Sequence, residues 1–115
     1  MANTYHEENL PEEAREFHRM IRSVIEELEA VDWYHQRAAV TNDPQLKAIV
    51  EHNRDEEIEH ACMGLEWLRR KYPAWHENLK KFLFSEGDIA SLEEEEENQE
   101  NTETTDGSLG LRNTK

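Results

Sequence analysis

The sequence of 115 residues lacks features on which several classes of protein depend. Its one cysteine, Cys62, excludes an internal disulfide or a thiolate zinc cluster within the chain. No apolar run approaches the roughly 18 residues of a membrane span, and the start, MANTYHEENL, shows no secretory leader. Only 13 basic residues face 27 acidic ones, which argues against nucleic acid and favours cations as partners. We therefore expect a soluble cytoplasmic protein.

The net charge of −14 is unevenly distributed. Ten acids and no bases lie from Glu86 to Asp106, whereas residues 1–85 hold 17 acids and 11 bases, a difference of −6. A like-charged segment with few apolar residues cannot offset the entropy of ordering, so it predicts a disordered linker. The last residues lose the acids and gain two leucines, which fits a docking peptide or a frayed terminus. We predict a helical domain over 1–87, an acidic linker over 88–106 and a terminal peptide over 107–115.

Proline and capping residues divide the domain into helices, and strand signals are almost absent. Pro11 before two glutamates suits a helix start, Asp43-Pro44 suits a turn followed by a capped helix, and Pro73 ends that helix. We predict an all-α fold with two long antiparallel helices, over about 11–40 and 44–71, and a short third helix from Pro73 to about Phe84, closed by Gly87. Two long helices are half of a four-helix bundle, so we expect the chain to dimerise into such a bundle.

Charged side chains interrupt the apolar stripes of both long helices. The first stripe holds Phe17, Met20, Ile21, Val24, Leu28 and Val31, and the second holds Leu46, Ile49, Val50, Asn53, Gly64, Trp67 and Leu68. Glu27 lies roughly 20° from Met20 on the first helix, and Glu57 and His60 fall on the second stripe. A buried unpaired carboxylate costs several kcal/mol. Because the stripes carry no matching lysine or arginine, a bound cation is the simplest compensation.

Spacing sharpens this interpretation. Glu57 and His60 form a Glu-x-x-His pair, so both side chains leave one helix face and can reach one metal. Di-iron bundles use one Glu from each of two helices and a Glu-x-x-His pair from each of two others. This chain holds one copy of each part, so two chains supply four carboxylates and two imidazoles. Such a set suits iron or manganese.

Other candidates receive structural interpretations. Asp32 and His35 repeat the spacing, but Asp32 lies about 140° from Glu27 and is read as a surface or interface residue. Cys62 is read as a small apolar filler and two tryptophans as core or interface anchors, namely Trp67 and Trp75. The remaining histidines are read as surface residues, namely His6, His18, His52 and His76.

Three segments closely resemble the encapsulated ferritins, the cargo proteins of encapsulin nanocompartments. They are SVIEELEAVDWY at 23–34, HNRDEEIEHA at 52–61 and EWLRR at 66–70. The resemblance implies two-helix ferritin-like chains with a short third helix, of which two form a ferritin-like four-helix bundle. It also implies that dimers assemble into a ring of ten subunits, with a ferroxidase centre at the dimer interface.

The resemblance also implies roles for single residues. Glu27, Glu57 and His60 match the iron ligands, with Glu57 as the bridging carboxylate, and Tyr34 matches a tyrosine beside the centre. Acids of a metal-attraction site, where calcium or another divalent ion is a candidate occupant, are matched by Glu26 and Glu29, and its neighbouring aromatic by Trp33. From the residues alone, Glu26 and Glu29 are equally well a solvated acidic face.

The C-terminus resembles the family's encapsulation peptide, which docks the cargo on the shell protein. Ser108, Leu109, Gly110 and Leu111 fit its core, whereas Thr114 stands where an aliphatic residue is usual. The acidic linker then serves as a tether.

The function that we expect is oxidation of Fe²⁺ to Fe³⁺ at a di-iron centre shared by two subunits, for iron storage and detoxification inside an encapsulin nanocompartment. Two alternatives stay open. One is a peroxide-scavenging bundle like the rubrerythrins, although one cysteine excludes their Cys₄ site here. The other is a non-enzymatic cargo or adaptor whose acids only keep it soluble.

Overall fold

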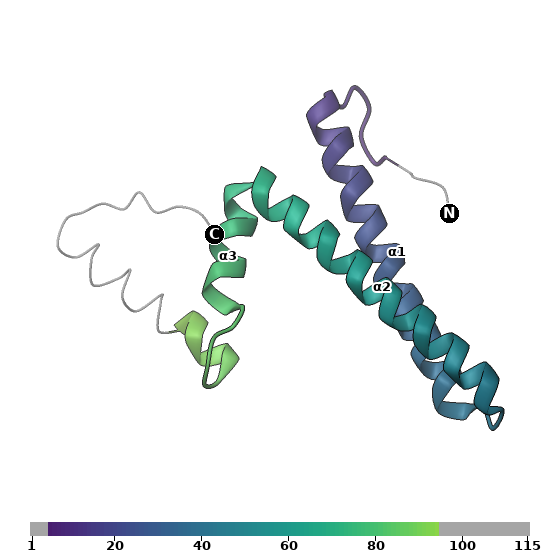
Figure 1. Ribbon diagram of the computed structural model, residues 1–115. Coiled ribbons are helices and arrows are strands. Elements are labelled where there is room, and N and C mark those ends of the chain that lie inside the picture. The colour runs from purple at the N-terminus through teal and green to yellow at the C-terminus, as the bar shows by residue number, and fades with distance from the viewer. Residues whose placement is uncertain (1–4, 95–115) are drawn as a thin grey trace, which may run out of the picture. The chain divides into compact units, whose positions relative to one another are not determined.

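Three helices make up most of residues 5–94, the part of the chain that the computed structural model describes (Figure 1). They are α1 (Glu12–Val40), α2 (Pro44–Lys71) and α3 (Pro73–Phe82). Residues 5–94 contain no strand. Across the same stretch, no helix is both long and apolar enough to cross a membrane. The predicted all-α fold, with two long helices and a short third one, is confirmed.

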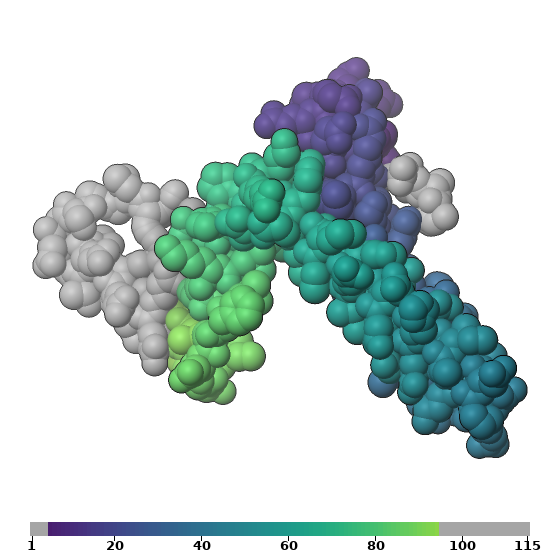
Figure 2. All heavy atoms as spheres, in the orientation of Figure 1, coloured from purple at the N-terminus to yellow at the C-terminus, as the bar shows by residue number. Residues whose placement is uncertain are grey.

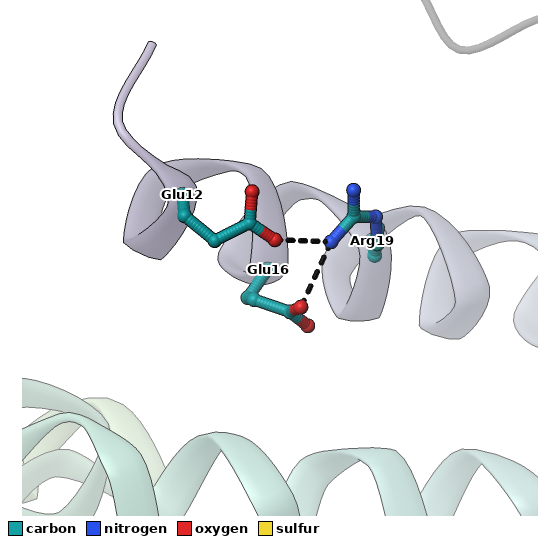
Figure 3. A network of polar contacts seen from close by, with 3 residues as sticks. All are labelled: Glu12, Glu16 and Arg19. Carbon is teal, nitrogen blue, oxygen red and sulfur yellow. Dashed lines mark hydrogen bonds and ion pairs between the residues drawn. The ribbon is translucent and has the colours of Figure 1, made fainter.

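The start of α1 follows from proline and a pair of acids. Pro11 is the N-cap residue, and its carbonyl accepts hydrogen bonds from the backbone N–H groups of Ala14 and Arg15. Glu12 lies in the first turn, where the helix dipole favours negative charge. Arg19 joins this turn to the next, with one guanidinium nitrogen 2.9 Å from Glu12 and 2.8 Å from Glu16 (Figure 3). These contacts are exposed, so they fix the local geometry more than they add stability.

The turn between α1 and α2 is short and well supplied with hydrogen bonds. The Asp43 carboxylate accepts from the backbone N–H groups of Gln45 at 2.9 Å and Leu46 at 3.3 Å, so it caps α2 as the sequence predicts. The Asp43 N–H in turn donates to the Thr41 hydroxyl at 3.1 Å. Pro44 is the first residue of α2, where its missing N–H costs nothing. The three-residue connection brings the two helices back side by side (Figure 1).

A small core holds the hairpin together. Its buried apolar residues are Val24, Ala38, Val50, Ala61 and Leu68. Gly64 lets the helices approach closely, because a Cβ built on it would lie 2.5 Å from Cγ2 of Val24 and 3.2 Å from Sδ of Met20. No side chain larger than hydrogen fits there without a shift of α1 or α2.

Several residues of the predicted apolar stripes lie at the surface of the single chain. Leu28 is 54% exposed, Leu46 45% and Ile49 56%, and Ile58 and Met63 on α2 are also exposed. Within the hairpin, α2 lies in front of α1 in the space-filling view, with its viewed face uncovered (Figure 2). The physical reason is that two packed helices bury only one side of each other. The hairpin therefore keeps apolar area that a further helix pair would cover.

Among the described residues, those from Arg69 to Glu94 belong to a second compact unit. Within it, a guanidinium nitrogen of Arg69 lies 2.8 Å from Nδ1 of His76.

The predicted end of the third helix differs slightly from the structure, since α3 ends at Phe82 and not near Phe84. Phe84 itself takes the left-handed conformation, with φ of 59°, directly after the helix. Gly87, with φ of 88°, belongs to the next turn and does not close α3.

The predicted disordered linker over 88–106 differs from the structure at its beginning, because residues 89–94 are helical. Asp88 caps this segment, as its carboxylate accepts hydrogen bonds from the N–H and the hydroxyl of Ser91 at 3.1 and 2.7 Å. The hydrogen bonds to the Asp88 carboxylate favour a helix here, although the acidic composition of the segment disfavours an ordered structure. The rest of the predicted linker and the terminal peptide over 107–115 lie outside the described residues.

Candidate metal centre

The three predicted ligands meet between the two long helices. Glu27 on α1 and Glu57 and His60 on α2 each offer one ligand atom, and these atoms all lie within 4.8 Å of one another. Nδ1 of His60 is 3.5 Å from Oε1 of Glu57, as the spacing of three residues on one helix predicts. The side chains of Glu57 and His60 are 27% and 41% exposed, so the cluster is partly open to its surroundings.

Glu27 carries the clearest electrostatic signature of the site. Its Oε1 is buried and has no hydrogen-bond partner in the structure. Burial raises the pKa of the Glu27 carboxyl, the negative charges of Glu57 and Glu26 raise this pKa further, and His60 opposes them. A desolvated carboxylate beside a second carboxylate is unfavourable unless a proton or a cation compensates it.

The donor set fits a divalent transition metal. Two carboxylate oxygens and an imidazole nitrogen are the ligands that iron and manganese accept readily, and no soft thiolate takes part. The orphaned oxygen of Glu27 is available for such an ion. The chemistry of these residues therefore fits iron or manganese.

Helix packing places the ligands. The close contact between Val24 and Gly64 lies one turn from the cluster on each helix, since Val24 precedes Glu27 by three residues and Gly64 follows His60 by four. This contact sets the separation of α1 and α2 where the ligands stand. A carboxylate from one helix can reach the pair on the other because the backbones approach so closely.

The other predicted site residues lie outside the cluster. Glu26 is exposed and 3.9 Å from a guanidinium nitrogen of Arg22, and Glu29 is exposed as well. Trp33 is 53% exposed. Tyr34 is half-buried, with the Arg37 guanidinium 5.5 Å from its ring centre. Within a single chain, the predicted metal-attraction residues therefore do not belong to the cluster of the three predicted ligands.

The alternative Asp-x-x-His pair is at the surface. Asp32 accepts a hydrogen bond from the side-chain amide of Gln36 at 3.0 Å. Nδ1 of His35 lies 3.2 Å from a guanidinium nitrogen of Arg54. These contacts agree with the surface interpretation drawn from the angle to Glu27.

Sequence reasoning missed two contributors. The Glu56 carboxylate lies beside the site, since its Oε1 is 3.9 Å from Nε2 of His60, four residues later on α2. Its other oxygen is 3.8 Å from Nε2 of His52, four residues earlier. The spacing of four residues in both directions could have indicated this. Gly64 was placed on the stripe, but its role as the point of closest approach was not predicted. A lone glycine on the apolar face of a long helix is the signal that could have shown it.

Comparison with known proteins places the chain in a family. The EncFtn-like family model matches residues 3–86, which includes α1, α2, α3 and all three clustered ligands. The chain belongs to the EncFtn-like family. The resemblance to the encapsulated ferritins that the sequence showed is thereby confirmed.

Relatives of this EncFtn-like protein carry related names. It is 49% identical over 114 residues to a protein of Thermotoga maritima named ferritin-like protein, covering 97% of this chain and 98% of the relative. It is 56% identical over 94 residues to a protein of Rhodospirillum rubrum named encapsulated ferritin-like protein, covering 80% of this chain and 67% of the relative. A crystal structure of a protein from Nitrosomonas europaea is 53% identical, with a TM-score of 0.72, and the match covers 74% of this chain and 97% of that one.

Proposed function

We propose that this EncFtn-like protein is a ferroxidase that oxidises Fe²⁺ to Fe³⁺ at a di-iron centre formed by two copies of the chain. The observation that carries the proposal is the convergence of Glu27, Glu57 and His60, with the buried oxygen of Glu27 lacking a partner. Membership of a ferritin-like family supports iron as the substrate.

Two copies are needed because one chain supplies only half of a di-iron ligand set. Di-iron bundles take four carboxylates and two imidazoles, which is twice what this hairpin offers. The partial exposure of Glu57 and His60 leaves the cluster open to a second copy. Exposed apolar side chains such as Leu28 and Ile49 provide area for the contact. The same doubling would complete the four-helix bundle and the site.

We assign the roles as follows. Glu57 of each copy would hold two Fe²⁺ ions as the bridging carboxylate, and Glu27 and His60 would hold them terminally. Two Fe²⁺ ions would together give two electrons to one dioxygen molecule, the proposed acceptor, which would take up two protons and leave as hydrogen peroxide. The carboxylates favour the harder ferric product. His60 binds as the neutral imidazole and the glutamates as carboxylates, so oxidation should slow in acid. Glu56 would be a neighbour of this ligand, since its Oε1 lies 3.9 Å from Nε2 of His60.

The surroundings of the centre belong to the same proposal. Glu26, Glu29 and Trp33 would form a metal-attraction site once copies assemble into a ring of ten, and calcium or another divalent ion could occupy it. Tyr34 would stand beside the centre. The chain would be the cargo of an encapsulin nanocompartment that stores the ferric mineral, docked through Ser108, Leu109, Gly110 and Leu111. The name of the Rhodospirillum rubrum relative, encapsulated ferritin-like protein, supports a location inside such a compartment.

Iron oxidation tests the proposal directly. Metal-free protein is loaded with Fe²⁺ without oxygen, and Fe³⁺ formation is followed after dioxygen is added. We expect oxidation well above the rate in buffer, and loss of that excess in the double variant Glu57→Ala with His60→Ala. The matched control is His76→Ala with Glu77→Ala on α3, which removes the same residue types and should keep full activity.

The outcomes separate the remaining alternatives. Unchanged kinetics in the Glu57 and His60 variant would contradict the ligand assignment. If the unaltered protein neither takes up Fe²⁺ nor accelerates its oxidation, the non-enzymatic adaptor would be the remaining function. Consumption of added peroxide in preference to dioxygen, measured per iron, would favour the peroxide-scavenging function.

A further inference from the structure

An arginine lies one turn from the proposed ligands on α2. Arg54 precedes Glu57 by three residues, and its side chain is only 23% exposed. A positive charge so close to a proposed cation site disfavours metal binding by repulsion. Burial raises the pKa of the Glu27 carboxyl, and the charge that lowers it is that of His60, so Arg54 does not compensate this group. The arginine therefore needs another role.

The Arg54 guanidinium joins the two long helices. Its Nε donates to Oδ1 of Asp55 at 3.0 Å, and one terminal nitrogen lies 3.2 Å from Nδ1 of His35 on α1. A guanidinium can only donate, so Nδ1 of His35 is the acceptor and the imidazole is neutral, with its proton on Nε2. This contact, the Arg54–His35 bracket, is a directed hydrogen bond from α2 to α1, and Asp55 holds the arginine in place.

The bracket and the close contact at Gly64 lie on opposite sides of the metal cluster. Along α2, the two ligands lie between Arg54 and Gly64, and along α1, Glu27 lies between Val24 and His35. The two contacts keep one antiparallel register, because they are 11 residues apart on α1 and 10 apart on α2. They are about 16 Å apart along the helices. The cluster is thus held between an apolar contact and a polar one.

The two contacts constrain different motions of the helices. The contact of Gly64 with Val24 limits how closely the backbones approach, but apolar contact has no direction and allows α2 to roll about its axis. A hydrogen bond weakens steeply as its angle departs from linearity, so the bracket opposes that roll. A roll of α2 moves Glu57 and His60 together, since both leave the same helix face. The bracket therefore acts on the direction in which these ligands point.

We propose that Arg54 is a positioning residue, whose hydrogen bond to His35 holds α2 in the rotation at which its two ligands face Glu27. Iron is taken as the ion that these ligands hold, so this role of Arg54 rests on the proposed function. Charge and positioning predict opposite effects. Loss of the positive charge alone would tighten Fe²⁺ binding, whereas loss of the bracket weakens it. The sign of the change therefore separates the two.

Anaerobic Fe²⁺ titration of the metal-free full chain tests the proposal. Arg54→Met keeps a long side chain and removes its donors, whereas His35→Leu removes the acceptor and keeps the arginine. We expect each variant to bind Fe²⁺ roughly three- to tenfold more weakly than the unaltered chain. The double variant should bind as weakly as either single variant, because both remove the same contact. His35→Gln keeps an acceptor oxygen and should retain most of the affinity.

Two controls separate positioning from more general effects. Lys47→Met removes a positive charge from an exposed position of α2 and should not weaken Fe²⁺ binding. Asp43→Ala removes the cap of α2 without changing the bracket, so it should lower the stability and leave the Fe²⁺ affinity as it is. Chemical denaturation gives the stability of each variant. Light scattering should give the same particle mass for all of them.

The outcomes distinguish the bracket from the iron site. An Arg54→Met protein that binds Fe²⁺ as tightly as the unaltered chain, or more tightly, would overturn the positioning role and leave the proposed iron site intact. Additive losses in the double variant would also overturn it, as would an affinity that follows stability in every variant, Asp43→Ala included. A smaller particle for Arg54→Met would assign its effect to assembly instead. If the unaltered chain binds no Fe²⁺, the proposed function fails and this role of Arg54 fails with it.

Discussion

The turn of the hairpin and the middle of its interhelical contact are built on different principles. At the turn, the Asp43 carboxylate accepts from backbone donors of α2 and the Asp43 N–H donates to the Thr41 hydroxyl, so both polar groups of Asp43 have partners. Around Gly64 the helices are pressed together, and beside that contact Glu27 has a buried oxygen with none. The turn is optimised for folding, whereas the middle keeps an electrostatic cost that a proton or a bound cation relieves. Stability and function are therefore expected to separate along the hairpin.

Widening the close contact should have the largest effect. In Gly64→Val the added side chain meets Val24 at the point where an added Cβ alone would lie 2.5 Å away. We expect a loss of about 1–3 kcal/mol in the free energy of unfolding, together with slower iron oxidation, because α1 and α2 must separate at the ligands. Chemical denaturation and oxidation kinetics measure both. Cys62→Val, two residues away, is the matched control and should change neither, because Cys62 is exposed on α2 and does not fill the core as the sequence predicts.

Removing the cap should affect stability alone. Asp43→Ala leaves the N–H groups of Gln45 and Leu46 without their acceptor, and we expect a loss of about 1 kcal/mol in the free energy of unfolding. Iron oxidation per folded chain should stay unchanged, since the turn lies far along α1 and α2 from the ligands. A marked drop in the oxidation rate of this variant would show that the two regions are not independent.

Neutralising Glu27 should have the smallest effect on stability and the opposite sign. Folding raises the pKa of this carboxyl above its ordinary value of 4.5, so the folded state binds the proton more tightly than the unfolded state does. The stability of the metal-free chain should therefore fall as the pH rises from about 4.5 through the raised pKa. Glu27→Gln should remove this dependence and slightly raise the melting temperature at neutral pH, while iron oxidation is lost.

Glu29→Gln serves as the control for this substitution, because Glu29 is exposed on the same helix. It should leave the melting temperature and its pH dependence as they are. A Glu27→Gln protein that is less stable than the unaltered chain at neutral pH would mean that the carboxylate is paired in solution, contrary to its surroundings in the structure.

The sequence predicts the helices well because residues close to each boundary determine where the helix begins and ends. Asp43-Pro44 and Pro73 fix the limits of α2 through capping and the missing N–H of proline. The metal ligands could be predicted for a related reason, since acids on an apolar stripe are costly unless compensated.

The predictions that differ from the structure also have physical reasons. Leu28 and Ile49 belong to the apolar stripes yet are exposed in one chain, because two packed helices bury only one side of each other and the stripes are wider than that contact. Residues 89–94 are helical because one capping residue, Asp88, outweighs composition.

The central claim is that one hairpin holds half of an iron site. Its most direct test is anaerobic titration of the metal-free chain with Fe²⁺, with particle mass followed by light scattering and bound iron counted at each step. The account predicts that iron-bound particles contain an even number of chains, at least two, and one Fe²⁺ per chain at the centre. A single chain that binds Fe²⁺ tightly through Glu27, Glu57 and His60 without associating would contradict it.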